Sequence, residues 1–401
     1  MYSKPKLRVV FFASHSTTLL RQYWEQLKDK VECFWMTANS DVYAELQKAA
    51  YPNIVFKSLY SPEFKPLILY KILRRIKQRL ASIFFKRLIQ KTINALMPNI
   101  IISNTTLILS DYFSSAMKVL VFHSVPYKKY IIIEETLKYN LALLPNEYCK
   151  NEIIKRFKTD NTDKLRVVGW PRIDDFINNK FTKDDRDNFA KKIGLNLQLK
   201  NVLYAPTWDS FHDNGLFPKS FGNVIDAFEE FCKELKKLNI NLIIRLHCLA
   251  HKLIADNRLL QIADKYNVCF VNGRIGGYLD NLIEHFLWIT DVLISDISGT
   301  ATDFMTLNRP IVYIEPDNKD FSWQTADLPK EYRAGVVANS LSQLIEGVKE
   351  SLNNPERYKS QREELLKKIF YRPDGSSSKR AADEILSYYQ EFSNNKGNLK
   401  L

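Results

Sequence analysis

The stretch Asp291-Val292-Leu293-Ile294-Ser295-Asp296-Ile297-Ser298-Gly299-Thr300 decides the fold. It is a short apolar run that ends in a polar loop, and a helix is expected directly afterwards, over residues 301–307. A strand that is apolar throughout is typical of a parallel sheet covered on both faces. Hydroxyls and a glycine directly before a helix place backbone N–H groups and the positive end of a helix dipole at an anion. The stretch therefore predicts an α/β unit with an anion-binding loop.

The same alternation of strands and helices extends over the chain, and 401 residues are enough for two domains. We expect domains at residues 1–170 and 171–386, followed by a polar tail at 387–401. Alternating strands and helices predict parallel sheets with right-handed crossovers, so the expected class is α/β and doubly wound. The expected strands are 8–13, 31–36, 99–103, 119–122, 141–144, 164–168, 201–205, 241–246, 268–271, 292–295 and 311–314.

The composition is that of an ordinary globular protein, with 45% apolar and 26% charged residues. Five scattered cysteines without a C-x-x-C pair indicate neither a disulfide framework nor a zinc site, which fits a reducing cytoplasm. The sequence shows no apolar run of membrane-spanning length, and its first residues do not resemble a signal sequence.

The net charge of +13 is concentrated in one segment. Between Lys65 and Lys91 there are nine basic residues and no acidic one, interleaved with apolar residues at helical spacing. This basic helix, expected over residues 65–98, is either an ordinary domain helix or a helix that docks on anionic lipid or the acceptor. Nucleic acid is disfavoured, because no recognised nucleic-acid motif accompanies the patch. The candidate membrane or acceptor residues are Lys71, Arg74, Arg75, Arg79, Lys86 and Arg87.

Ligands of doubly wound sheets sit at the carboxyl ends of the strands, so the residues after each strand are the candidate site. Arg245 and His247 support the prediction that the loop at residues 295–300 binds an anion, since an arginine side chain matches phosphate oxygens in charge and geometry. Ser298 or Thr300 can instead simply cap the helix. The phosphate candidates are Arg245, His247, Ser295, Asp296, Ser298, Gly299 and Thr300. Further cleft candidates are His15, Arg172, Pro206, Thr207, Trp208 and Asp303.

Among the histidines, His123 is the candidate general base, because it follows an apolar strand and should face a cleft. A histidine in a turn is the alternative, and His15 competes for the same role. His247 and His251 are four apart and flank Cys248, but the pair falls on a strand-to-helix loop and no nearby carboxylate completes a ligand set, so no metal is predicted. His285 lies in an expected helix, where a packed histidine is the usual explanation.

Several ordered segments resemble the CDP-glycerol glycerophosphotransferase-like proteins of bacterial teichoic-acid and capsule synthesis. Val202-Leu203-Tyr204-Ala205-Pro206-Thr207-Trp208 is similar to the family's I-L-Y-A-P-T-W, and Gly169-Trp170-Pro171-Arg172-Ile173-Asp174 to its G-[YW]-P-R-x-D. Residues 245–247 resemble R-x-H-P, residues 291–312 the D-x-L-I-T-D-Y-S-S, D-F and K-P-I-I run, and residues 374–380 the closing D-G-x-S-S-x-R. The sequence departs from the family at residues 122–128, which lack the tryptophan and glycine of W-H-G-T-P-x-K, at Cys248, and at residues 297–299.

The resemblance implies a GT-B fold, in which two Rossmann-like doubly wound domains face each other across a cleft. It also implies that His247, Ser295, Ser298 and Gly299 contact the donor pyrophosphate, and that His123 corresponds to the family's base. No cofactor is expected beyond a nucleotide-diphosphate donor, with a CDP-linked one favoured.

The expected function is transfer of a polyol phosphate, of the glycerol or ribitol type, to a hydroxyl of a glycan or lipid-linked acceptor. The alternative is a GT-B glycosyltransferase that uses a nucleotide sugar in capsule, lipooligosaccharide or other surface polysaccharide synthesis, and a nucleotide-sugar epimerase is a third possibility. The expected location is the cytoplasm, peripherally on the inner face of the membrane, with no nucleic-acid partner.

Overall fold

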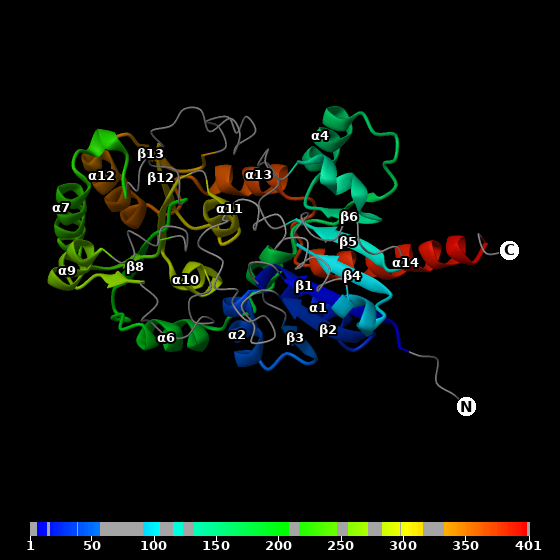
Figure 1. Ribbon diagram of the computed structural model, residues 1–401. Coiled ribbons are helices and arrows are strands. Elements are labelled where there is room, and N and C mark those ends of the chain that lie inside the picture. The colour runs from blue at the N-terminus through cyan, green and yellow to red at the C-terminus, as the bar shows by residue number, and fades with distance from the viewer. Residues whose placement is uncertain are drawn as a thin grey trace, which may run out of the picture. The chain divides into compact units, whose positions relative to one another are not determined.

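The protein was analysed as a computed structural model that describes eleven ranges of the chain. These are residues 6–13, 17–37, 39–56, 91–104, 115–122, 132–207, 216–246, 256–271, 283–296, 298–315 and 333–398. The chain divides into two compact units (Figure 1): residues 1–126, 131–172 and 376–401 form the first, and residues 127–130 and 173–375 the second.

The first unit contains a parallel sheet of seven strands in the order β3-β2-β1-β4-β5-β6-β7. The direction of winding reverses between β1 and β4, as in a Rossmann-like sheet. Fully buried residues of β1, β4 and β5 form its core, together with residues of the last helix, α14. The strands are β1 Arg8–Ala13, β2 Glu32–Thr37, β3 Ile54–Phe56, β4 Ile100–Ser103, β5 Met117–Val121, β6 Leu141–Leu144 and β7 Leu165–Val167. The described helices are α1 Thr18–Leu27, α2 Ser40–Lys48, α4 Glu147–Phe157 and α14 Ser377–Asn398.

The second unit contains a parallel sheet of six strands in the order β10-β9-β8-β11-β12-β13, and its winding reverses between β8 and β11. The strands are β8 Lys200–Tyr204, β9 Ile240–Ile244, β10 Cys269–Phe270, β11 Val292–Ser295, β12 Ile311–Ile314 and β13 Val336–Ala338. The described helices are α5 Asp174–Ile177, α6 Lys183–Lys192, α7 Val224–Lys236, α9 Asn257–Lys265, α10 Ile283–Ile289, α11 Gly299–Met305, α12 Leu341–Asn353 and α13 Lys359–Ile369.

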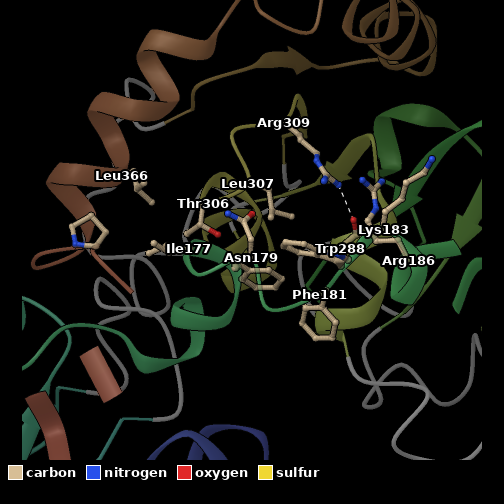
Figure 2. A pocket seen from close by; sticks show the side chains of 12 residues that line it. Ile177, Asn179, Phe181, Lys183, Arg186, Trp288, Thr306, Leu307, Arg309 and Leu366 are labelled. Atoms are coloured by element: carbon tan, nitrogen blue, oxygen red, sulfur yellow. Dashed lines mark hydrogen bonds between the residues drawn. The ribbon is translucent and has the colours of Figure 1, made fainter. Parts of the chain in front are cut away.

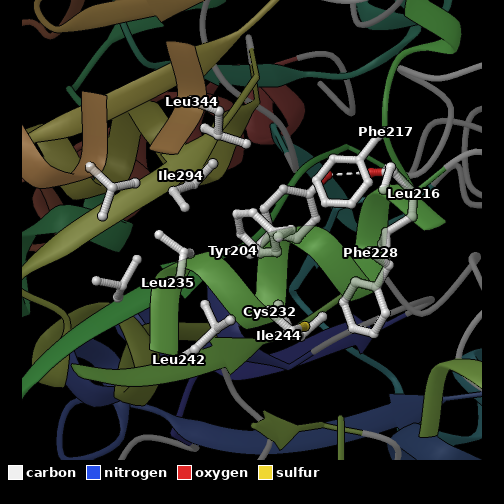
Figure 3. Packing of buried hydrophobic residues seen from close by; sticks show 14 of the residues in the cluster. Tyr204, Leu216, Phe217, Phe228, Cys232, Leu235, Leu242, Ile244, Ile294 and Leu344 are labelled. Atoms are coloured by element: carbon white, nitrogen blue, oxygen red, sulfur yellow. Dashed lines mark hydrogen bonds between the residues drawn. The ribbon is translucent and has the colours of Figure 1, made fainter. Parts of the chain in front are cut away.

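Aromatic side chains fill the core between β8 and α7 in the second unit (Figure 3). The fully buried ring of Tyr204 lies 5.2 Å from that of Phe217 and 5.6 Å from that of Phe231, measured between centroids. Its hydroxyl donates to the carbonyl of Leu216, so the one polar atom of this side chain is satisfied inside the core. The packing fixes the end of β8, from which the Pro206–Thr207 loop begins.

The two doubly wound sheets confirm the predicted α/β class, but the structure differs from the predicted division at the C-terminus. The predicted boundary at 170/171 lies two residues from the observed one, whereas residues 376–386 belong to the first unit instead of the second. Residues 387–398 are not a tail, because they continue α14. The physical reason is that Ala381, Ala382 and Ile385 are fully buried in the core of the first unit.

Candidate functional site at the carboxyl ends of the second sheet

The ends of three neighbouring strands, β8, β9 and β11, meet at the point where the second sheet reverses its winding. Tyr204 at the end of β8 pairs with Ile244 of β9 and with Ile294 of β11. Beyond these pairs, the amide of Arg245 donates to the carbonyl of Tyr204 at 3.0 Å, and the amide of Ala205 to that of Ile294 at 2.9 Å. The structure thus brings together the predicted Pro206–Thr207 loop, Arg245 and the loop that begins at Ser295.

Two side chains tie the loop after β11 to the loop after β8. The carboxylate of Asp296 is 1% exposed and accepts hydrogen bonds from both the amide and the hydroxyl of Thr207, at 3.1 Å. The hydroxyl of Ser295 donates to the carbonyl of Ala205 at 2.7 Å. Because a carboxylate repels phosphate, this geometry supports a positioning role for Asp296. A direct phosphate contact, as the sequence suggested for Asp296, is disfavoured.

Ser298 caps helix α11. Its hydroxyl oxygen accepts from the amide of Ala301 at 3.2 Å and lies 2.8 Å from the hydroxyl oxygen of Ser295. Both serine hydroxyls are buried and engaged within the protein, so the helix-cap alternative describes what Ser298 does here. Gly299 and Thr300 are half-buried at the start of α11. The backbone amides of this first turn and the Thr300 hydroxyl are therefore the groups of the loop best placed to meet a phosphate.

Tyr204 is a neutral group that is close enough to Asp296 to feel its negative charge. Burial raises the pKa of its hydroxyl well above the ordinary value, and the negative charge of Asp296 raises it further. The tyrosine is therefore a neutral, hydrogen-bonded part of the core and cannot act as a base near neutral pH.

Arg245 is half-buried, and its guanidinium carbon lies 5.7 Å from the centroid of the Phe286 ring on α10. A ring face at this distance stabilises the cation. Phosphate binding by Arg245 stays a prediction, which its position beside the end of β8 favours.

The remaining candidates divide into three groups. Asp303 is buried within α11, and Arg172 lies in a short 3₁₀ helix, Pro171–Ile173, at the end of the first unit. His285 packs against the rings of Phe181 and Phe189, so the packed-histidine interpretation fits. Outside the described residues lie His15, His123, Trp208, His247, His251 and the basic residues Lys71, Arg74, Arg75, Arg79, Lys86 and Arg87.

The end of the predicted basic helix is described, because residues 91–96 are helical and Ile93 is fully buried. Here the helix contributes to the domain core, as in the first of the two alternatives. None of the helices within the described ranges combines the length and the apolar character needed to cross a membrane.

Residues 116–387 match the family of CDP-glycerol:poly(glycerophosphate) glycerophosphotransferases. The chain belongs to this family. The match begins one residue before β5 and covers the whole second sheet with its Thr207–Asp296 bridge, so the family assignment from ordered motifs is confirmed.

Two curated relatives show the range of the family. A teichoic acid poly(glycerol phosphate) polymerase of Bacillus spizizenii is 26% identical over 258 residues, which cover 63% of this chain and 61% of the relative. The teichoic acid ribitol-phosphate polymerase TarL of Staphylococcus aureus is 25% identical over 214 residues, 53% of this chain and 35% of TarL. The chain thus spans about three fifths of the first relative's length and a third of the second's.

Solved structures agree on the fold over nearly the whole chain. The wall teichoic acid polymerase TagF superposes with a TM-score of 0.65 at 18% identity, covering 98% of this chain and 90% of TagF. A UDP-GlcNAc 2-epimerase from Neisseria meningitidis superposes with a TM-score of 0.62 at 13% identity, covering 95% of this chain and all of the epimerase. These matches confirm the predicted GT-B class.

Proposed function

We propose that the protein transfers a polyol phosphate, of the glycerol or ribitol type, from a CDP-activated donor to a hydroxyl of a bacterial surface glycan or lipid-linked acceptor. Family membership supports the reaction class, and the relatives named above include both glycerol- and ribitol-phosphate polymerases. The observation that carries the proposal is the bridge from Asp296 to Thr207, which joins two strand-end loops at the switch point of the sheet.

The proposed reaction is displacement at phosphorus. An acceptor hydroxyl oxygen forms a bond to the phosphorus that carries the polyol, and the bond from that phosphorus to the bridging oxygen of CMP breaks. CMP leaves with the electron pair, and the hydroxyl proton passes to His123, the proposed base. Arg245, His247 and the first turn of α11 would stabilise the charge that gathers on the pyrophosphate oxygens. No metal or organic cofactor enters this scheme.

A donor panel tests the reaction class. Protein, a glycerol-phosphate-primed acceptor and CDP-glycerol, CDP-ribitol or a UDP-sugar are incubated separately, and the products are identified by mass. We expect addition of a polyol phosphate with release of CMP. Addition of a sugar with release of UDP would instead establish the glycosyltransferase alternative.

Substitution of His123 tests the proposed base. His123→Ala should lower the transfer rate by about 10²–10⁴-fold, while the dissociation constant of CDP-glycerol changes little. His251→Ala, which also removes an imidazole, is the matched control and should keep the wild-type rate. Full turnover in the His123 variant would remove this residue from the mechanism.

We further propose that the basic helix holds the protein peripherally on the cytoplasmic face of the membrane. Replacing Arg74, Arg75 and Arg79 by Gln should weaken sedimentation with vesicles containing anionic lipid, because each basic residue near such a surface contributes about 1 kcal/mol. Removing three exposed lysines of α6 and α7, Lys191, Lys233 and Lys236, gives a control of equal charge. Equal loss of binding in both variants would show that only net charge matters.

A further inference from the structure

A cavity of about 520 Å³ lies within the second unit, away from the predicted site (Figure 2). Trp288 comes from the end of α10, shortly before β11, and Arg309 comes directly before β12. Both residues therefore mark the amino-terminal edge of the parallel sheet, whereas the Ser295–Thr300 loop lies at its carboxyl edge. The volume falls within the range of small-molecule pockets.

Three cationic side chains, Lys183, Arg186 and Arg309, line this cavity, and no carboxylate is among its described lining residues. Figure 2 shows the three side chains gathered on one side of it. Arg186 and Arg309 are close enough to repel each other, and burial together with Arg186 lowers the pKa of Arg309 to about 10, while Asp291 opposes the shift. An anion between them would relieve this repulsion.

Arg309 also has a structural task, since its Nη1 donates to the carbonyls of Trp288 at 2.8 Å and Thr290 at 2.6 Å. These two hydrogen bonds satisfy carbonyl groups at the end of α10. They give Arg309 a structural role, which the other two cations of the cavity do not share. Neither Arg186 nor Lys183 forms an ion pair or a side-chain hydrogen bond with any other described residue.

Two carboxylates near the cavity, Asp185 and Asp291, have hydrogen-bond partners of their own. Asp185 accepts from the amide and the hydroxyl of Thr182 in the capping box that begins α6. Asp291 accepts from the amide of Asn201 at 2.8 Å and faces Lys200. Lys183 is the first residue of the ten-residue helix α6, whose first turn also contains Asp184 and Asp185. The described lining of the cavity thus carries three cations and no carboxylate, and Asp291 is the carboxylate that acts on Arg309.

Aromatic rings form the rest of the wall. The ring of Trp288 stacks on Phe176, with centroids 5.9 Å apart, and lies 5.4 Å from Phe181. The Trp288 side chain is 6% exposed, yet its indole Nε1 has no hydrogen-bond partner among the described residues. The Nε1 atom itself is inaccessible, as are those of Trp24 and Trp35, so the contribution of Trp288 to the cavity is its ring.

We propose that this cavity binds a phosphate monoester whose organic part is apolar or carries a ring. The phosphate would lie between Arg186 and Arg309, and the organic part would lie against Trp288. Guanidinium groups match phosphate oxygens in geometry, and aromatic faces favour a ring or an acyl chain over water. The proposal does not depend on the transfer reaction, because the site shares no residue with the strand-end loops.

Indole N–H signals in an NMR spectrum can test the site directly. Labelling the six tryptophans with ¹⁵N gives six indole signals, and single Trp→Phe variants assign them. Phenyl phosphate is the first probe, and inorganic phosphate is the comparison. We expect phenyl phosphate to shift the Trp288 signal saturably and with higher affinity than inorganic phosphate. CMP and short-chain phosphatidic acid then show whether the cavity prefers a phosphate monoester of a nucleotide or of a lipid. The signal of Trp208, which follows Thr207 in the sequence, reports binding at the donor loops.

Charge variants give the decisive comparison. Arg186→Gln should weaken phenyl phosphate about tenfold, as expected for loss of one charge-assisted hydrogen bond, and should leave the fold intact. Lys191→Gln removes one charge from the exposed side of the same helix and should change nothing. The proposal is overturned if Trp288 does not respond at millimolar ester, if inorganic phosphate binds as tightly as the ester, or if both variants weaken binding equally.

Discussion

The Asp296 carboxylate accepts hydrogen bonds from two donors of Thr207, across 89 residues of sequence: the backbone amide bonds to both carboxylate oxygens, and the hydroxyl bonds to one of them. Because the bridge positions two loops of the predicted donor site, Asp296→Asn should lower kcat/KM for the CDP-linked donor about 10–100-fold. The NH₂ of asparagine would replace one of the two oxygens that share the Thr207 N–H, so one of these two contacts becomes a contact between donors. Steady-state kinetics with CDP-glycerol measure the loss.

Thr207→Val separates the two bonds of this bridge. It removes the hydroxyl bond, keeps the amide bond and preserves the shape of the side chain, so its effect should be smaller, about threefold to tenfold. Circular dichroism should show both variants folded. A Thr207→Val loss as large as that of Asp296→Asn would mean that the hydroxyl itself contacts the donor.

Much of the site region follows from local patterns. Strand Val292–Ser295 has the predicted bounds, because the apolar run that forms it is limited by Asp291 on one side and by a polar loop on the other. The proximity of Thr207, Arg245 and Ser295 follows because the carboxyl ends of neighbouring parallel strands lie at the same edge of the sheet. The sequence could not assign the partner of a carboxylate: Asp296 was grouped with phosphate ligands, whereas the structure pairs it with Thr207.

Contacts between residues far apart in sequence set the limit of prediction. The cavity beside Trp288 is lined by side chains from four helices, α5, α6, α10 and α13, and from the segment before β12. No local sequence pattern predicts that these side chains lie together. The side-chain amide nitrogen of Asn99, Nδ2, likewise donates to the hydroxyl of Tyr389, 290 residues away. The polar surface of residues 387–398 resembles a solvated tail in sequence, and only packing on the first unit shows that these residues continue α14.

Ile385 tests the structural role of α14. Its side chain is fully buried with β1, β4 and β5, so Ile385→Ala should destabilise the protein by about 2–4 kcal/mol through lost burial and a residual cavity. Chemical denaturation followed by circular dichroism measures the change. Gln390→Ala, at an exposed position of the same helix, should stay within about 0.5 kcal/mol of wild type. Equal effects would contradict a core role for this helix.

Buried cysteines should be unreactive in the folded protein. Burial raises the pKa of Cys33 and of Cys232 to about 12, and raises that of Cys149 as well. At pH 8 a thiol with a pKa near 12 is thiolate in only about one molecule in 10⁴, against roughly one in four for an ordinary cysteine. Iodoacetamide followed by peptide mass spectrometry should therefore modify these three residues only in denaturant. Rapid labelling of Cys232 in native buffer would show that α7 opens readily.

Gly335 is required by the close approach of two neighbouring strands in the second sheet. A Cβ at this position would overlap the carbonyl oxygen of Ile311 and lie 3.2 Å from the Tyr313 ring. The obstacle is backbone at the start of β12, which cannot rotate away, so Gly335→Ala should cost about 1–3 kcal/mol and displace β13. Denaturant midpoints measure this cost, with Asn339→Ala at the exposed turn after β13 as the control. An unchanged midpoint in Gly335→Ala would show that β13 can move away from β12 without loss of stability.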